Sequence, residues 1–221
     1  MEDLVRIQHE VPVEDLFFST TDAKGVITQA NSIFERLSRY PYIMLIGRPH
    51  NVVRHPDMPG GAFRLVWDML HEAKPTCGYV VNQAADGSAY WTFSTMTPHA
   101  DGYLSVRARP CASEFFGAVS SAYPGVRAQE LASRSDGASA QSAAELGADL
   151  LNASLSTLGY DSYADFVREV LPAEVQARRL AAAASFDGKL PEGIPGILLA
   201  AVYDIDDSLA RFLSELTQSQ T

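Results

Sequence analysis

The stretch GRPHNVVRHPDMP, residues 47–59, contains two histidines, two arginines, one aspartate and three prolines. Proline fixes φ and lacks an N–H group, so it interrupts any long helix. Because Pro49, Pro56 and Pro59 follow each other closely, no more than a single helical turn fits between the first two of them. The stretch is therefore predicted to be a stiff, irregular connection that presents its polar side chains at fixed positions.

The polar side chains of this stretch suit a particular class of ligand. The guanidinium of Arg54 could bind a phosphate through two hydrogen bonds or lie on an aromatic plane. His50 and His55 can stack, donate and accept, and Asp57 can accept from ribose hydroxyls or ring N–H groups. Together these groups suit a large planar ligand with a charged tail, such as a nucleotide or a flavin. In the alternative interpretation, Arg54 and Asp57 pair with each other and the histidines lie at the surface.

The segments on either side of the stretch predict a mixed α and β domain. Helical spacing of apolar residues occurs at 32–40, where Asn31 stands at the N-cap position, and again at 60–73. Alternating or β-branched runs bounded by turn residues predict strands at 17–22, 26–31, 78–83, 88–98 and 103–110. This order predicts an α+β fold, in which a five-stranded antiparallel sheet carries short helices on one face.

The second half of the chain, residues 111–221, shows little strand pattern and is rich in alanine, serine and glycine. We expect 133–143 to be a flexible linker. The spacing of apolar residues predicts helices at 146–158, at 161–170, from Pro172 to 185, and at 197–216. The apolar stripe of the last helix is typical of a packing face, which either folds on its neighbours or pairs with a second chain.

The composition argues against several classes of function. The net charge of −10 on 221 residues argues against non-specific binding to nucleic acid. No apolar run approaches the ~20 residues of a membrane-spanning helix, and the acidic N-terminus is unlike a secretory signal, so we expect a cytoplasmic protein. Cys77 and Cys111 lack CxxC spacing and predict neither a zinc site nor a disulfide. Common catalytic motifs are missing, and no third ligand is evident beside His55 and Asp57, so we expect neither a metal site nor an enzyme.

Three parts of the chain resemble the PAS domain family: STTDAKGVITQANSIFERLSRY, GRPHNVVRHPDMPGGAFRLVWDML and GYVVNQAADGSAYWTFSTMTP. They are most similar to the PAS domain of bacterial aerotaxis receptors. In that family the run PHN-x-VRHPDMP is characteristic, and it stands complete at 49–59. The run DG-x-x-YW at 86–91 is the matching hairpin. The resemblance covers about residues 15–110.

The resemblance implies a sensor fold and, as in aerotaxis receptors, a non-covalently bound FAD whose redox state reports oxygen or electron-transport activity. Family positions implicated in FAD binding match His50, Arg54, His55 and Asp57, and Asn31 also matches a family position. The chain departs from the family at Thr76, where aerotaxis receptors have a tryptophan that supports flavin binding.

The indoles of this chain, Trp67 and Trp91, are candidates for contact with the cofactor, and core packing is the alternative for each. Other PAS domains hold haem through a histidine. His50 or His55 could serve that role, with Trp91 near the distal side. A further alternative is a PAS module that has no cofactor and mediates dimerisation or interaction.

The resemblance also implies that the chain is divided into an input part and an output part. The expected divisions are an N-terminal cap at 1–14, the PAS sensor domain at 15–110, a linker or helical connector at 111–143 and an α-helical output or dimerisation region at 144–221. The expected partners are a second copy of the chain in a homodimer and a downstream chemotaxis signalling domain or protein.

Overall fold

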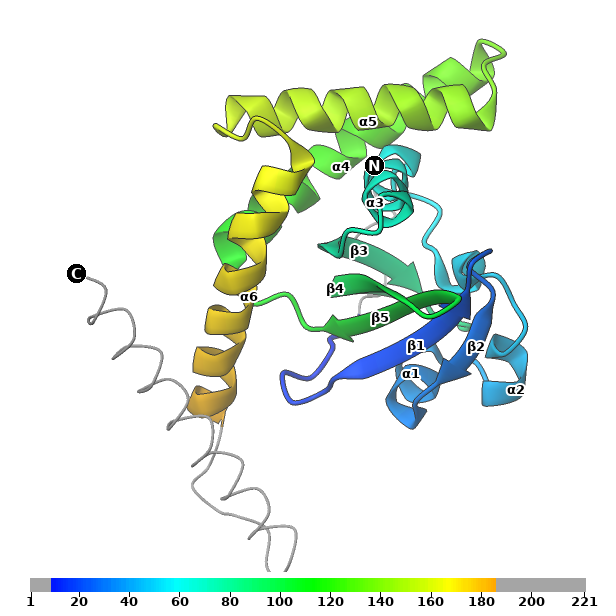
Figure 1. Ribbon diagram of the computed structural model, residues 1–221, viewed down its shortest axis with the longest axis vertical. Helices are drawn as coiled ribbons and strands as arrows, with labels where there is room; N and C mark the ends of the chain where they lie inside the picture. The colour runs from blue at the N-terminus through cyan, green and yellow to red at the C-terminus, as the bar shows by residue number, and fades with distance from the viewer. Residues whose placement is uncertain (1–8, 186–221) are drawn as a thin grey trace, which may run out of the picture. The chain divides into compact units, whose positions relative to one another are not determined.

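The structure is a computed structural model, and it describes residues 9–185 (Figure 1). The predicted five-stranded antiparallel sheet is confirmed. Its strands, in chain order, are β1 (Phe17–Asp22), β2 (Ile27–Ala30), β3 (Thr76–Gln83), β4 (Ala89–His99) and β5 (Gly102–Ala108). They lie in the order β2-β1-β5-β4-β3, so β5, the last of the described strands, is the middle strand of the sheet and pairs with β1.

The two-residue period of the strands gives the sheet two different faces. The inner face carries polar side chains, among them Ser94 on β4 and Arg107 on β5, which lie opposite each other in the register. The outer face of β3 and β4 is aromatic: Tyr79 pairs with Phe93, and their ring centroids are 5.3 Å apart. Since buried polar groups require hydrogen-bond partners, the inner face cannot be closed by apolar side chains alone.

Short helices follow β2 and lie on the inner side of the sheet. In chain order they are α1 (Ser32–Ser38), α2 (Tyr42–Leu45), the 3-10 turn η2 (His50–Val53) and α3 (Gly60–His71). The predicted N-cap is confirmed, because the Asn31 side chain accepts a hydrogen bond from Phe34 N at 3.1 Å. Phe34 is fully buried and packs against Phe17 of β1, with ring centroids 5.8 Å apart. This contact holds α1 to the sheet.

The second half of the described chain is helical, as expected, and consists of α4 (Ser113–Ser135), α5 (Ala140–Thr157) and α6 (Tyr163–Ser185). The expectation of a flexible linker at 133–143 is wrong. These residues form the end of α4, a turn at Gly137 with φ of 93°, and the start of α5. Ser139 caps α5 by accepting from Ser142 N at 3.0 Å. The polar residues of this segment thus serve to end one helix and begin the next.

Pro172 does not begin a helix as predicted, because α6 runs continuously through it. A proline inside a helix removes a backbone hydrogen bond and costs about 3 kcal/mol. Val167 and Val170 before the proline and Glu174 after it are all buried, and this continuous buried face offsets the cost. The helix predicted at 197–216 lies outside the described residues.

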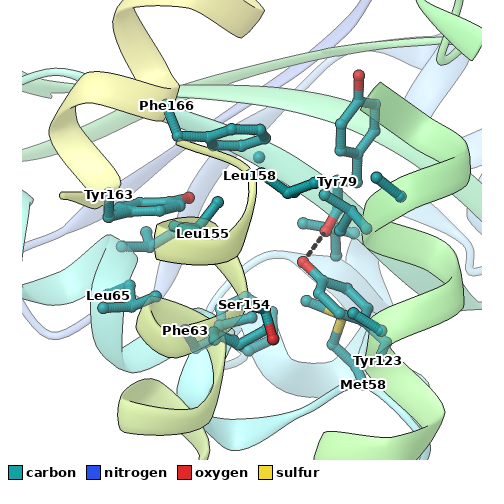
Figure 2. Close-up of a pocket in the computed structure, with 18 residues that line it drawn as sticks. Met58, Phe63, Leu65, Tyr79, Tyr123, Ser154, Leu155, Leu158, Tyr163 and Phe166 are labelled. Carbon is teal, nitrogen blue, oxygen red and sulfur yellow. Dashed lines mark hydrogen bonds between the residues drawn. The ribbon is translucent and has the colours of Figure 1, made fainter. Parts of the chain in front are cut away.

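Helices α4 and α6 cover the aromatic outer face of β3 and β4. Tyr123 of α4 donates its hydroxyl proton to Tyr79 O at 2.9 Å (Figure 2). From α6, the Glu174 carboxylate accepts from the Tyr79 hydroxyl at 2.7 Å, and its second oxygen accepts a backbone N–H just after β5 at 2.8 Å. Trp91 of β4 meets Phe116 of α4 edge to face, with ring centroids 5.2 Å apart. The helical half is therefore joined to the sheet by both aromatic and polar contacts.

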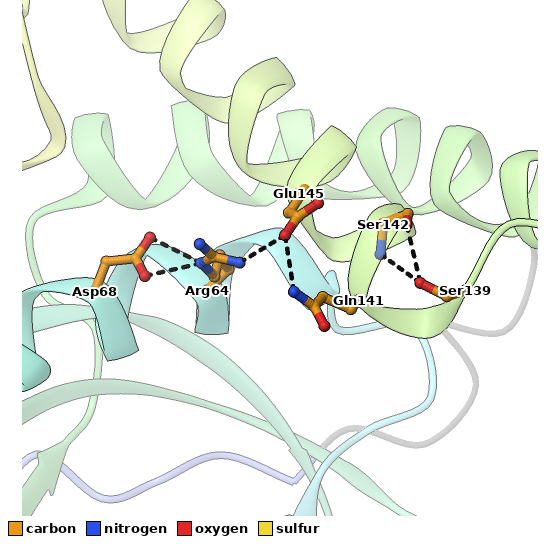
Figure 3. A network of polar contacts seen from close by, with 6 residues as sticks. All are labelled: Arg64, Asp68, Ser139, Gln141, Ser142 and Glu145. Carbon is orange, nitrogen blue, oxygen red and sulfur yellow. Dashed lines mark hydrogen bonds and ion pairs between the residues drawn. The ribbon is translucent and has the colours of Figure 1, made fainter.

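Helix α3 crosses α5 closely at its first turn. Gly61 lies against the backbone of Gly147 and Ala148, and a Cβ atom at this position would overlap those backbone atoms. One turn later, Arg64 forms an ion pair with Glu145 of α5 at 3.1 Å (Figure 3). The close crossing thus depends on the absence of a side chain at Gly61.

Replacing Gly61 by alanine is expected to destabilise the protein by about 1–3 kcal/mol, because the added methyl group forces α3 and α5 apart. Gly125 on α4 is the matched control, since a Cβ atom there has no heavy atom within 4 Å. Gly125→Ala should instead stabilise its helix by about 0.5–1 kcal/mol. Urea unfolding measures both effects, and equal stabilities of the two variants would contradict the close crossing.

Candidate functional site

A cavity of about 300 Å³ lies between the inner face of the sheet, the stretch 47–59 and α3. Its lining includes side chains of the sheet that are polar, namely Thr21, Asn82, Ser94, Ser105 and Arg107. Apolar side chains of α3 line another part of it, namely Phe63, Val66, Trp67 and Leu70. A cavity of this kind, with a few polar groups beside an apolar wall, is typical of a small-molecule site.

Arg107 is the charged group at the floor of the cavity, and it is 4% exposed. Its Nη2 atom donates to Ser19 Oγ at 3.1 Å and to His50 Nε2 at 2.5 Å. Its guanidinium lies over the rings of Phe34 and Phe17, 5.1 and 5.8 Å from their centroids. Burial lowers the pKa of Arg107 to about 10, so the group remains charged at neutral pH. Among the described residues, its Nη1 atom has no hydrogen-bond partner.

His50 is held neutral by its surroundings. Burial lowers its pKa well below the ordinary value, and the charge of Arg107 lowers it further. Because the guanidinium can only donate, Nε2 of His50 must be the acceptor, which leaves the ring proton on Nδ1. The ring also stacks on Phe34, with centroids 5.9 Å apart. His50 thus fixes the position of Arg107 without neutralising its charge.

Arg54 lines the cavity beside β3. Its backbone forms an isolated bridge with Asn82. Its Nη2 atom donates to Met58 O at 2.9 Å, and its guanidinium lies 4.6 Å from the centroid of the Phe63 ring. Burial lowers the pKa of Arg54, and the nearby charge of Arg127 lowers it further. The aromatic stacking expected for this guanidinium is therefore present within the protein itself.

His55 and Asp57 lie together at the far end of the stretch. Nδ1 of His55 accepts from Asp57 N at 3.2 Å, and the Asp57 carboxylate lies 3.8 Å from the same nitrogen. His55 is buried, and neither side chain is among the described residues that line the cavity. The alternative in which Arg54 pairs with Asp57 is wrong for the described contacts, because Arg54 binds Met58 O and Asp57 lies beside His55. The stretch instead divides, with His50 and Arg54 at the cavity and the other two residues away from it.

Two further predicted residues lie away from the cavity and have structural contacts. Asn31 accepts from Phe18 N at 3.3 Å and donates to Leu16 O at 3.1 Å, in addition to capping α1. Trp91 lies on the outer face of the sheet, where it contacts α4. Neither is among the described residues that line the cavity. The cavity therefore brings together His50, Arg54 and Trp67 from the predicted set.

Trp67 and Tyr103 form an aromatic pair at the cavity. Their rings meet edge to face with centroids 5.2 Å apart, and the ring centroid of His71 lies 5.6 Å from that of the indole. Thr76, where the aerotaxis receptors carry tryptophan, is buried at the start of β3 and does not line the cavity in the described chain. The aromatic surface of this cavity thus comes from α3 and β5.

Arg107 is the principal residue that the sequence reasoning missed. It stands in the run YLSVRARP, in register with Tyr103 and Ser105, and all three line the cavity. A strand that is half buried places every second residue on the same face. The two-residue spacing of Arg107 from Ser105 and Tyr103 could therefore have indicated that its side chain faces the cavity.

Comparison with known proteins links this geometry to a family. No protein-family model matches the chain. It is 37% identical over 134 residues to the aerotaxis receptor of Escherichia coli (strain K12), an alignment that covers 58% of the chain and 26% of the receptor. It is 31% identical over 80 residues to the nitrogen fixation regulatory protein of Klebsiella pneumoniae, covering 36% of the chain and 16% of that protein. The domain is a PAS domain similar to that of aerotaxis receptors.

Several solved structures also resemble part of the chain. The LOV domain of the blue-light photoreceptor Aureochrome1 in its light state aligns with a TM-score of 0.40 and 20% identity, over 42% of this chain and 80% of that one. The chain spans about a quarter of the length of the aerotaxis receptor and less of the nitrogen fixation regulatory protein.

Residues 9–185 also lack two kinds of feature, a membrane-spanning helix and a metal-binding cluster. None of the helices in this part of the chain is long and apolar enough to cross a membrane. The same residues contain no group of three or more histidine, cysteine, aspartate or glutamate side chains that could hold a metal ion. Cys77 and Cys111 are free thiols, and burial raises the pKa of Cys77 to about 12.

The lowered pKa of His50 predicts how stability depends on pH in the protein without ligand. The folded protein keeps His50 neutral, whereas the unfolded chain binds a proton as the pH falls through 6.5. The contribution is therefore complete above pH 6.5 and is lost on acidification. Between pH 6.5 and 5, the free energy of unfolding of the wild type should fall more steeply than that of His50→Gln, by about 1 kcal/mol per pH unit. Urea unfolding at several pH values tests this, and parallel curves would refute it.

Proposed function

We propose that the PAS domain binds FAD without a covalent bond, and that the chain is a sensor reporting redox state or oxygen for aerotaxis-type signalling. The observation that carries the proposal is the Arg107 guanidinium. It lines the cavity, its hydrogen-bond partners Ser19 and His50 are both neutral, and its Nη1 atom has no partner among the described residues. An unpaired buried donor of this kind costs free energy, and a ligand that brings an acceptor or a negative charge recovers it.

The lining of the cavity fits the isoalloxazine ring of a flavin. Arg107, Asn82 and Ser94 supply hydrogen-bonding groups from the sheet for the carbonyl and ring-nitrogen edge. Val66 and Trp67 supply apolar surface from α3 for the ring faces. A bound flavin would supply reversible electron and proton exchange. The charge of Arg107 would favour the forms of the ligand that carry negative charge at this edge.

Arg54 suits the charged tail of the same ligand. It lines the cavity, and among the described residues its one hydrogen-bond acceptor is Met58 O, which uses one of its five N–H donors. The stack on Phe63 fixes the plane of the guanidinium, which leaves its remaining edge preorganised for a phosphate. The two arginines would thus bind different parts of the ligand, Arg107 the ring and Arg54 the tail.

The geometry favours a flavin over haem. A haem-binding PAS domain requires an axial histidine, and of the described histidines His50 is the one that lines the cavity. Its Nε2 lone pair already accepts a hydrogen bond from Arg107 at 2.5 Å. The nitrogen that could bind iron is therefore engaged by a cation.

The wider role rests on the similarity to the aerotaxis receptor, a quarter of which the chain matches. We place the protein in the cytoplasm as a non-enzymatic homodimer that acts on a downstream chemotaxis signalling domain or protein. The free thiols of Cys77 and Cys111 are consistent with a reducing compartment. The helices α4, α5 and α6 follow the PAS domain directly, and are the candidate output region.

Loss of the Arg107 charge should weaken FAD binding. Wild-type protein should bind FAD and show visible absorbance that bleaches with dithionite. Arg107→Gln should raise the Kd by about 10–100-fold, because a hydrogen bond to a charged group contributes about 1.5–3 kcal/mol. Trp91→Phe, on the outer face of the sheet, is the matched control and should bind FAD as the wild type does. Fluorescence titration measures the Kd, and far-UV circular dichroism confirms that each variant is folded.

Three results would contradict the proposal in different ways. A folded wild-type protein that takes up no FAD would favour the cofactor-free interaction module. A Soret band that shifts with CO would favour the haem sensor. FAD binding that is equally tight in folded Arg107→Gln would remove Arg107 from the site.

A further inference from the structure

Helix α4 reaches back to the proline-rich stretch through two side chains, which we call the α4 clamp (Arg127 and Glu130). Glu130 accepts from Gly60 N at 2.9 Å and from Gly61 N at 2.8 Å, with one carboxylate oxygen on each. Arg127 donates to Pro56 O at 3.0 Å and to the Glu130 carboxylate at 3.0 Å. The α4 clamp therefore holds the stretch near its end and the first turn of α3 together.

The carboxylate of Glu130 lies between two other helices, α3 and α5. The residue is 1% exposed, and a Cβ atom at Gly147 of α5 would overlap its Oε1 atom. The first turn of α3 has N–H groups without intrahelical acceptors and carries partial positive charge, both of which a carboxylate satisfies. A single side chain thus fastens α3, α4 and α5 at one point.

The clamped backbone is also the backbone that positions the ligand-facing side chains. Arg54 donates to Met58 O, which lies between the two points that the α4 clamp holds. The guanidinium of Arg54 stacks on Phe63, which follows the clamped glycines on α3. A displacement of the clamped backbone would therefore move both Arg54 and Phe63 at the cavity.

A second, apolar cavity of about 50 Å³ lies among α3, α4, α5, α6 and β3 (Figure 2). Phe63, Val66 and Val80 line both this cavity and the ligand cavity. These three side chains form a wall one residue thick between the ligand cavity and the helical half. The space behind the wall gives Phe63 room to move when the contents of the ligand cavity change.

We propose that the α4 clamp couples the ligand cavity to the helical half, so that a bound flavin favours the clamped state of α4 and α5 and its loss favours their release. This inference rests on the proposed function. A ligand shifts an equilibrium only through its different affinities for the two states. The difference arises here because the clamped state places Arg54 and Phe63 at the cavity wall. The coupling is reciprocal. Breaking the clamp lowers the affinity for the ligand by the same factor by which bound ligand favours the clamped state.

Amide hydrogen exchange of the full chain, with and without saturating FAD, measures this coupling. In the wild type, FAD should slow exchange in α4 and α5. Glu130→Gln keeps the shape of the side chain, but offers one acceptor oxygen to two N–H groups and removes the charge. It should weaken FAD binding about tenfold and remove the FAD-dependent slowing in α4 and α5.

Two variants control this experiment. Glu145→Gln removes a carboxylate from the exposed α3–α5 ion pair with Arg64 (Figure 3), and such pairs contribute little. It should leave FAD affinity and FAD-dependent exchange unchanged. If Glu130→Gln does not fold, Arg127→Gln serves in its place, because it cuts the hydrogen bond to Pro56 O and leaves the carboxylate on α3. It should weaken FAD binding about threefold.

The outcomes separate this inference from the proposed function. If the wild type binds FAD but exchange in α4 and α5 does not change, the coupling is refuted and the flavin site stands. The same holds if folded Glu130→Gln, or Arg127→Gln in its place, binds FAD as tightly as the wild type. If the wild type binds no FAD, the proposed function fails and the coupling fails with it. The coupling would be established if the factor by which Glu130→Gln lowers FAD affinity matches the factor by which FAD slows exchange in the wild type.

Discussion

The backbone of the stretch 47–59 is paired with the sheet at two points, and the geometry of the cavity depends on them. One bridge joins Pro49 to the residue before β2, and the other joins Arg54 to Asn82 of β3. The short turn η2 spans the distance between them, because the prolines at either end allow no longer helix. His50 and Arg54 are thereby held beside the inner face of the sheet. The stretch 47–59 therefore acts as a rigid wall of the cavity, although η2 is its only described helical turn.

The second constraint is the burial of the Arg107 charge. Removing a guanidinium from water is costly unless its donors are satisfied. This domain satisfies part of the requirement with a hydroxyl, a neutral imidazole and two aromatic faces, none of which cancels the charge. A carboxylate in the place of His50 would neutralise the cation and remove its attraction for a ligand. Because these partners are neutral, the potential inside the cavity stays positive. The inner face of the sheet is therefore suited to binding a ligand rather than to forming an apolar core.

The helical half meets the PAS domain through two buried carboxylates. Glu130 of α4 binds the first turn of α3, and Glu174 of α6 binds the Tyr79 hydroxyl and the backbone where the chain leaves β5. Each is about 1–2% exposed, so each would be costly to leave without its partners. Contacts of this kind are either made or broken, so they have two distinct arrangements. The polar interface is therefore suited to transmitting a change in the cavity to the helices.

The sequence by itself determined the five strands, the helices α1 and α3 and the Asn31 cap, since burial with a period of 2 or 3.6 residues is a local pattern that needs no knowledge of neighbours. It also indicated that 47–59 is an irregular, rigid connection. Only the tertiary structure decided which of its polar side chains face the cavity, because an irregular segment has no period and its orientation depends on distant backbone bridges. The structure likewise decided that Arg107, from a strand far along the chain, supplies the central charge, and that 133–143 joins two packed helices. Each of these depends on contacts between residues remote in sequence, which a local pattern does not specify.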